Sequence, residues 1–197
     1  MKKDDHSERI LSRRNFLKAM GSAAVVAAVG GMAVRAPGAE AACMELPKRW
    51  DETYDVVVIG SGFAGLAAAI EAKNAGAKDV VVIEKTPVHG GNSVINGGDF
   101  CAPGTRLQKE NGVEDNPELL LQDMLRPGLY LNSPELAKTV AYNAKDALEW
   151  TESYLGCKYV KLNFHGGHSV KRAHGTINQS GSEVVNKEMA KASEVGV

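Results

Sequence analysis

The chain has 197 residues, of which 24 are acidic and 23 basic, so its net charge is −1. The hydrophobic share of 44 % is that of an ordinary globular protein. This balance excludes a strongly basic or acidic protein, and we expect neither nucleic acid nor an anionic membrane surface as a partner. The three cysteines form no CxxC pair, which excludes a zinc ribbon and a c-type haem attachment site.

Residues 1–41 have the pattern of a twin-arginine export signal. Arg13 and Arg14 precede Phe16, and a mildly apolar, glycine-interrupted run follows at residues 19–34. That run is too short and too weakly apolar for a comfortable membrane span, and Ala39 and Ala41 fit an A-x-A cleavage site. We therefore expect a signal peptide at 1–41, a linker at 42–53, a periplasmic location and no membrane anchor. A retained anchor and a lipoprotein at Cys43 are weaker alternatives.

Without residues 1–41, the chain keeps 16 basic and 20 acidic residues, a net charge of −4. Cys101 and Cys157 are the cysteines of this part other than Cys43. They could form a disulfide outside the cytoplasm, but we expect two buried free thiols.

Residues 54–85 carry a dinucleotide-binding fingerprint in its required context. Residues 55–59 are a mostly β-branched run that predicts a buried parallel strand, and residues 66–75 predict a helix. The turn between them reads Gly-Ser-Gly-Phe-Ala-Gly over residues 60–65, and residues 80–83 predict a second strand. Glu84 ends that strand nineteen residues after Gly65, as the fingerprint requires.

Each part of the fingerprint has a physical role. Gly60 allows the tight turn, Gly62 lets the backbone approach a pyrophosphate, and Gly65 lets helix and strand pack closely. The amides and dipole at the helix start favour phosphate charge. Glu84 can accept hydrogen bonds from ribose hydroxyls, which favours a ribose without a phosphate.

Residues 85–98 contain two glycine pairs separated by small polar residues. Such a segment makes a poor core element but a good wall for a flat ligand, because the backbone can lie close to it. A flexible loop is the alternative. Further on, Asn116-Pro117 and Ser133-Pro134 predict two helix starts. We expect the second helix to bury Leu136, Val140, Ala144 and Ala147 or Leu148, and to stop at Gly156.

Residues 164–176 hold three of the five histidines. A metal site is disfavoured because two glycines separate His165 from His168 and no acidic or thiol ligand lies nearby in sequence. We expect a loop near the cofactor, with Lys171 or Arg172 near a phosphate or flavin carbonyl. His174 could be a structural donor.

Residues 181–193 predict a helix with Val184, Val185, Met189 and Ala192 inward. A third parallel strand is expected next, and the sequence ends before it. The interpretation is therefore an α/β, Rossmann-like dinucleotide-binding domain with a doubly wound parallel sheet, truncated before its third strand, over residues 54–197. A fragment, a truncated gene and half of a split protein all remain open.

The residues resemble the fumarate reductase/succinate dehydrogenase flavoprotein family, within it the soluble flavocytochrome c type. The resemblance covers residues 53–197 and rests on DVVVIGSGFAGLAAAIEA, IEK…GGNS…GG, SPELAKTV and GGHSVKRAHGT. It implies FAD, with the pyrophosphate near the glycine-rich turn, the adenosine ribose at Glu84, and the ribityl chain and flavin along residues 85–98. The implied cofactor-binding residues are Gly60, Gly62, Phe63, Ala64, Gly65, Glu84, Lys85, Gly91, Asn92, Ser93, Gly97 and Gly98.

In relatives with covalent flavin, a histidine precedes the second glycine pair. Gly91 holds that position here and His89 is two residues away, so the resemblance implies non-covalent FAD. Soluble relatives often carry a multihaem domain on the same chain. Its absence implies a separate electron-donor cytochrome or subunit.

The resemblance places the family's catalytic arginine downstream of the matching region, so no catalytic residue is predicted, and no metal ligand. We therefore expect an FAD-dependent oxidoreductase of which this fragment alone is inactive. The resemblance implies hydride transfer between flavin and a C=C bond of an unsaturated carboxylate, a small-molecule substrate. Two alternatives remain: a 3-ketosteroid dehydrogenase-type flavoenzyme, which shares this front half, and a non-catalytic truncated remnant.

Overall fold

We describe the fold from a computed structural model, which describes residues 48–197. The predicted signal peptide and residues 42–47 of the linker lie outside the described residues. Residues 51–197 cluster into one unit. Within the described residues, no helix is both long enough and apolar enough to cross a bilayer.

A two-stranded parallel sheet carries the fingerprint. Strands β1 (Val56–Ile59) and β2 (Val80–Ile83) pair in register from Val56 opposite Val80 to Ile59 opposite Ile83. Helix α2 (Phe63–Asn74) is the crossover between them. The β-branched runs favour strands here because their side chains pack well on a pleated surface. Both predicted strands and the predicted crossover helix are confirmed.

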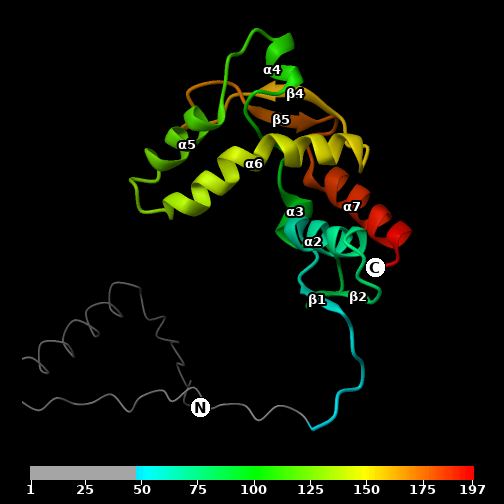
Figure 1. The fold of residues 1–197 in the computed structure, drawn as a ribbon. Coiled ribbons are helices and arrows are strands. Elements are labelled where there is room, and N and C mark those ends of the chain that lie inside the picture. The colour runs from blue at the N-terminus through cyan, green and yellow to red at the C-terminus, as the bar shows by residue number, and fades with distance from the viewer. Residues whose placement is uncertain (1–47) are drawn as a thin grey trace, which may run out of the picture. The chain divides into compact units, whose positions relative to one another are not determined.

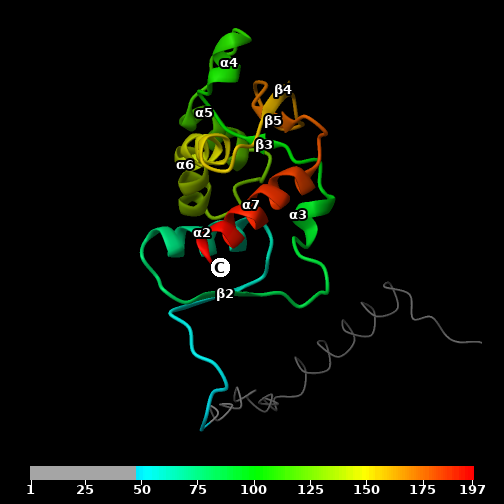
Figure 2. The same ribbon diagram turned by 90° about the vertical axis from the view of Figure 1, so that its right-hand side faces the viewer.

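Helices cover one face of this sheet. α2 and α7 (Gly181–Val195) lie side by side over it in both views (Figures 1 and 2). Leu66 and Ile70 of α2 and Val185 of α7 are buried in this layer. On the other face, Val57, Ile59 and Ile83 are 50 %, 87 % and 52 % exposed. The α/β class is confirmed, with helices on a single side of the described sheet.

A second sheet, which the sequence did not predict, lies at the other end of the molecule (Figure 1). It is antiparallel, in the order β3 (Phe100–Cys101), β5 (Ala173–Thr176), β4 (Tyr159–Asn163). All four residues of the central strand β5 are buried. Its sequence, Ala-His-Gly-Thr, has a single β-branched residue and no alternation, so tertiary packing decides its conformation rather than propensity.

The remaining helices are short apart from one. They are α3 (Asn92–Ile95), α4 (Arg106–Glu110), α5 (Pro117–Leu125) and α6 (Pro134–Ser153). The two predicted starts are confirmed by their caps. The side chain of Asn116 accepts a hydrogen bond from the amide of Leu119 at 2.9 Å, and Ser133 caps α6 in the same way. Each start has proline at the first position, where no intrahelical donor is lost.

The buried face of α6 differs from the prediction. Leu136 and Val140, expected inward, are 69 % and 53 % exposed. Ala144 and Leu148 are buried as expected, together with Ala137, Ala141 and Thr151. The buried stripe therefore runs one residue later along the first two turns. Small alanine side chains face the core there, and they let the helix backbone approach its neighbours closely.

Helix α7 buries the apolar residues that the sequence indicated and one polar residue that it did not. Val184, Val185 and Ala192 are buried, and Met189 is half-buried. Glu188 is also buried, at 2 % exposure. Cys101, half-buried, and Cys157, buried, are both free thiols. Burial raises the pKa of Cys157 to about 11, so its thiol is unreactive near neutral pH.

Candidate dinucleotide site

The three fingerprint glycines have the geometry that the pattern predicts. Gly60 has φ +101°, which favours glycine, and its amide donates to the carbonyl of Ile83 at 2.7 Å. A Cβ on Gly65 would overlap the carbonyl oxygen of Gly60, so only glycine allows this close approach. A Cβ on Gly62 would lie 3.1 Å from the Ser93 hydroxyl. The turn is therefore tight, and three of its six residues carry no side chain.

The start of α2 presents free backbone donors. Gly62 is the N-cap residue and supplies no side-chain cap. The amide of Phe63 donates to Oγ of Ser93 at 3.1 Å. Among the described residues, no hydrogen-bond acceptor is found for the amides of Gly62 and Ala64. Unsatisfied amides at a helix start, together with the helix dipole, form a site suited to phosphate oxygens.

Glu84 is held in place as a carboxylate. One oxygen accepts hydrogen bonds from the amide and hydroxyl of Ser61 at 3.0 and 2.6 Å, and the other from the amide and hydroxyl of Thr86, both at 3.0 Å. These bonds, those from Ser61 first, lower the pKa of Glu84 to about 2. Glu84 is therefore an anionic acceptor at every physiological pH, and a phosphate group on the ribose that it contacts would be repelled.

Ser61 is a residue that the sequence analysis missed. It is 3 % exposed, and its hydroxyl both donates to Glu84 and accepts from the amide of Gly90 at 2.9 Å. It thus joins the turn after β1, the end of β2 and the start of the glycine-rich segment. The available signal was a hydroxyl residue between the first two glycines of the fingerprint.

These parts surround one cleft of about 460 Å³. It is formed by the ends of β1 and β2, the turn before α2, and the segment that leads into α3. Seven of the twelve predicted cofactor residues line it. They are Gly60, Gly62, Glu84, Lys85, Gly91, Asn92 and Ser93.

The other five predicted residues lie outside this lining. Phe63 packs against the hydrophobic core, Ala64 is exposed on the first turn of α2, and Gly65 contacts Gly60. Gly97 is exposed, and a Cβ on it would meet no atom within 4 Å. Gly98 is buried with φ +69°, and a Cβ there would lie 2.5 Å from the backbone of Ser180. Gly98 therefore rests against the start of α7.

The residues present fit FAD at this cleft. The bare turn and free amides suit a pyrophosphate, and the fixed carboxylate of Glu84 suits ribose hydroxyls. The segment of glycines and small polar residues beside them is open on one side, because Gly91 and Asn92 are exposed. A flat ring system can therefore lie along the backbone without displacing a large side chain.

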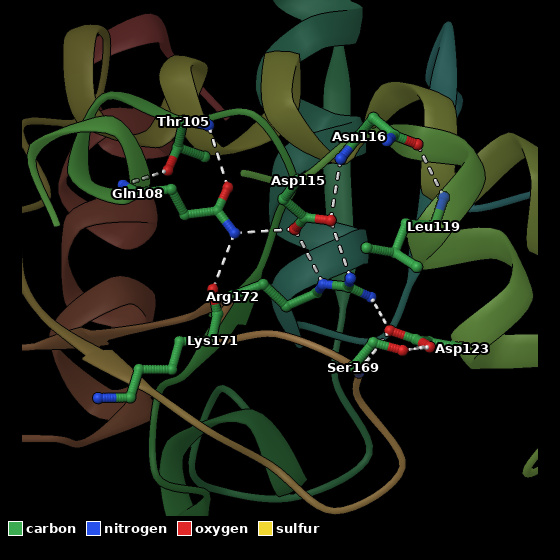
Figure 3. Close-up of polar contacts among 9 residues, drawn as sticks. All are labelled: Thr105, Gln108, Asp115, Asn116, Leu119, Asp123, Ser169, Lys171 and Arg172. Atoms are coloured by element: carbon green, nitrogen blue, oxygen red, sulfur yellow. Dashed lines mark hydrogen bonds and ion pairs between the residues drawn. The ribbon is translucent and has the colours of Figure 1, made fainter. Parts of the chain in front are cut away.

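The expectation for Arg172 is wrong. Its side chain is fully buried, and Nε and Nη2 donate to the two oxygens of Asp115 at 3.0 and 2.8 Å (Figure 3). Nη1 lies 2.8 Å from Asp123, as an ion pair rather than an aligned hydrogen bond. A buried guanidinium requires such partners. Arg172 therefore locks the loop between β4 and β5 onto α5 and cannot reach a phosphate, whereas Lys171 is exposed.

The same network extends to a buried histidine. Gln108 donates to Asp115 and to the backbone of Lys171, both at 2.8 Å (Figure 3). Thr105, which caps α4, contacts Nε2 of His174 at 2.7 Å. His174 also contacts the carbonyl of Phe100 at 3.0 Å, and burial lowers its pKa. The structural role expected for His174 is confirmed. In the described part of the chain, no group of three His, Cys, Asp or Glu residues is placed to hold a metal ion.

Known proteins are similar to this chain in sequence and in fold. A family model described as an FAD binding domain matches residues 55–193. The acrylate reductase flavoprotein subunit of Shewanella woodyi is 40 % identical over 188 residues, which cover 95 % of this chain and 36 % of that protein. The fumarate reductase (cytochrome) of Shewanella frigidimarina is 41 % identical over 130 residues, 66 % of this chain and 22 % of that protein.

A solved structure of a fumarate reductase is similar to this chain in fold. The open conformation of a flavocytochrome c3 fumarate reductase matches all of this chain and 30 % of that chain, with a TM-score of 0.71 and 30 % identity. The chain thus spans about a third or less of the length of these relatives. It belongs to the FAD binding domain family, the flavoprotein family of the fumarate reductases that its sequence resembles.

Proposed function

We propose that this chain supplies the FAD-binding part of an oxidoreductase that transfers hydride between flavin and a C=C bond of an unsaturated carboxylate. The observation that supports this proposal is the cleft at the start of α2, where glycines, free backbone amides and the ionised Glu84 lie together. FAD, when bound, supplies the hydride chemistry. The chain's own residues bind the cofactor, orient it and keep Glu84 anionic. The twelve residues named from the sequence are its proposed ligands.

The substrate class rests on the relatives. Proteins named acrylate reductase, fumarate reductase and urocanate reductase match this chain at 36–41 % identity, and all three names refer to an unsaturated acid. A 3-ketosteroid dehydrogenase from Rhodococcus jostii matches at 25 % identity with a TM-score of 0.64. The steroid alternative therefore has weaker support. A remnant without catalytic activity would bind FAD weakly or not at all, so binding separates it from the enzyme.

Three further parts of the proposal concern the whole protein. Residues 1–41 direct twin-arginine export to the periplasm, a route that carries folded proteins and so suits a cofactor-loaded enzyme. FAD is held non-covalently, because Gly91 stands where covalent relatives have histidine. Electrons come from a separate cytochrome or subunit.

Replacing Gly62 by valine tests the cofactor site. Its branched side chain would occupy the space in front of the free amides and crowd Ser93, so the purified protein should lose its flavin. The measurement is the FAD-to-protein ratio from absorbance, with the dissociation constant by fluorescence titration. Ala68→Val is the matched control, since it adds a branched side chain at an exposed position of the same helix.

Glu84→Ala should weaken FAD binding by about 1–3 kcal/mol, the scale of a lost charged hydrogen bond. Part of that loss is indirect, because Ser61 and Thr86 lose the acceptor that holds them. Stoichiometric flavin in Gly62→Val would show that the cleft is not the cofactor site. Wild-type protein that is folded and free of flavin after FAD addition would favour the non-catalytic remnant.

A further inference from the structure

One side chain, that of Asn96, ties together the segment that borders the cofactor cleft. Asn96 is the C-cap residue of the short helix α3, and its Nδ2 donates to the carbonyl oxygens of Ser93 at 2.9 Å and Asn92 at 3.3 Å. Its Oδ1 accepts a hydrogen bond from the amide of Gly98 at 2.6 Å. The end of a helix leaves carbonyl groups without an intrahelical partner, and Asn96 supplies the donor here. A single side-chain amide therefore holds residues on both sides of it.

The start of α7 anchors the same segment. Helix α3 lies beside this end of α7 in both views (Figures 1 and 2). The amide of Gly181, the first residue of α7, donates to the carbonyl of Asn96 at 2.9 Å. A Cβ on Gly181 would overlap the carbonyl oxygen of Ser93, so α7 packs directly against the backbone of Ser93. The position of Ser93 is therefore fixed by two contacts, one with the Asn96 side chain and one with α7.

Ser93 connects this arrangement to the cofactor cleft, whose lining it forms in part. Its Oγ accepts the hydrogen bond from the Phe63 amide at 3.1 Å, so Ser93 satisfies one donor at the start of α2. A serine hydroxyl that accepts one hydrogen bond still has its own proton to donate. Among the described residues, that proton has no acceptor. The hydroxyl can therefore donate to a bound oxygen atom, beside the free amides of Gly62 and Ala64.

We propose that Asn96 is a positioning residue of the cofactor site, which holds Ser93 where its hydroxyl accepts from the Phe63 amide and donates to an oxygen atom of the cofactor. This inference rests on the proposed function. Asn96 acts through Ser93, because it does not line the cleft itself. Asn96 is exposed, and water can replace the hydrogen bonds of an exposed side chain, so these bonds add little to stability. Its replacement should therefore affect cofactor binding more than folding.

The test uses Asn96→Asp, which keeps the size of the side chain and the acceptor for Gly98 but places a carboxylate oxygen beside the carbonyl of Ser93. The Kd for FAD, from fluorescence titration, should rise about tenfold. The melting temperature of the FAD-free protein should change by less than about 4 °C. Ser93→Ala removes the hydroxyl through which Asn96 acts, so adding Asn96→Asp to it should raise the Kd by less than a further factor of about three.

A second measurement needs no cofactor. In the FAD-free protein, Asn96→Asp and Ser93→Ala should each speed hydrogen exchange of the Phe63 amide about tenfold, because that amide loses its acceptor or the acceptor moves away. A merely structural role for Asn96 would change neither this single amide selectively nor the dependence of the Kd on Ser93.

Asn111→Asp is the matched control, because Asn111 is the C-cap residue of α4, donates to the carbonyl of Leu107 at 2.8 Å and does not line the cleft. It should leave the Kd and the exchange of the Phe63 amide unchanged. An unchanged Kd in Asn96→Asp, or the same rise with and without the Ser93 hydroxyl, would overturn the inference and leave the proposed function standing. Folded wild-type protein that binds no FAD would refute the proposed function, and the role of Asn96 with it.

Discussion

Glu188 gives the sharpest test of the energetics of this fold. It lies on α7 with 2 % exposure, and its buried Oε2 has no hydrogen-bond partner among the described residues. It lines a cavity of about 70 Å³ whose other walls are mainly aromatic, aliphatic and hydroxyl side chains. Burial raises the pKa of Glu188 to about 8. The other residues that line the cavity are Phe63, Gly98, Asp99, Phe100, Thr151, Tyr159 and Val184.

The raised pKa makes stability fall as pH rises. Well below pH 4.5 both the folded and the unfolded chain hold the proton, so the group adds no pH dependence to stability there. Between pH 4.5 and about 8 the unfolded chain releases it and the folded chain does not, so the free energy of unfolding decreases. At about 1.4 kcal/mol per pH unit, the loss is about 3 kcal/mol by pH 7 and about 5 kcal/mol in total. A domain has only about 5–15 kcal/mol of net stability.

Two substitutions separate the charge from the polarity. Glu188→Leu removes both, so it should raise the free energy of unfolding by about 2–4 kcal/mol at neutral pH and remove this pH dependence. Glu188→Gln should also remove the pH dependence, but with a smaller gain, because an unpartnered amide stays buried at a cost of about 1–3 kcal/mol. The assay is urea unfolding followed by circular dichroism at about pH 5, 7 and 9.

The difference in the free energy of unfolding between variant and wild type at each pH isolates the contribution of Glu188 from that of the other titrating groups. Glu114→Gln, at an exposed position, is the control and should run parallel to wild type. The reasoning fails if wild type and Glu188→Gln keep a constant stability difference across about pH 5 to 9. It also fails if Glu188→Leu is less stable than wild type near neutral pH.

Three other predictions concern the rest of the chain. Arg172→Met should lower the free energy of unfolding by about 3–5 kcal/mol, because two carboxylates stay buried without their partner; urea unfolding measures it, and a loss under about 1 kcal/mol would show that water reaches the pair. Acid precipitation should leave flavin in the supernatant, since Gly91 offers no attachment, and a yellow pellet would contradict this. Replacing Arg13 and Arg14 together by lysine should leave the precursor unprocessed in the cytoplasm, and unchanged periplasmic yield on immunoblots would refute the export route.

The sequence predicted the parts of the fold that depend on local signals. The fingerprint placed β1, the turn and β2, because Gly60 has a positive φ and Gly65 closely contacts the backbone of Gly60. Proline and side-chain caps placed the starts of α5 and α6 for the same reason. The cleft could likewise be predicted, because its lining comes from segments on either side of one βαβ unit.

The parts that sequence analysis missed are held by contacts between distant residues. β5 is a strand because β3 and β4 flank it, and nothing in Ala-His-Gly-Thr requires that. The sequence suggested that Arg172 could bind a phosphate, but its guanidinium forms ion pairs with Asp115 and Asp123, which are far away in sequence. The prediction for the buried face of α6 was wrong because alanines pack against the core there. Alanine is only slightly hydrophobic, so it contributes little to a hydrophobic pattern.

The contact between Gly98 and the start of α7 has a consequence for when the protein can take up its cofactor. The backbone at Gly98 rests on Ser180 and Gly181, and the amide of Gly181 donates to the carbonyl of Asn96 at 2.9 Å. During synthesis, α7 leaves the ribosome more than eighty residues after this glycine pair, roughly 4–17 s later at about 5–20 residues per second. The glycine-rich turn at residues 60–65 is synthesised early. The segment at residues 85–98 gains its contact with α7 only later. We expect cofactor loading to be a late event, after translation has passed α7.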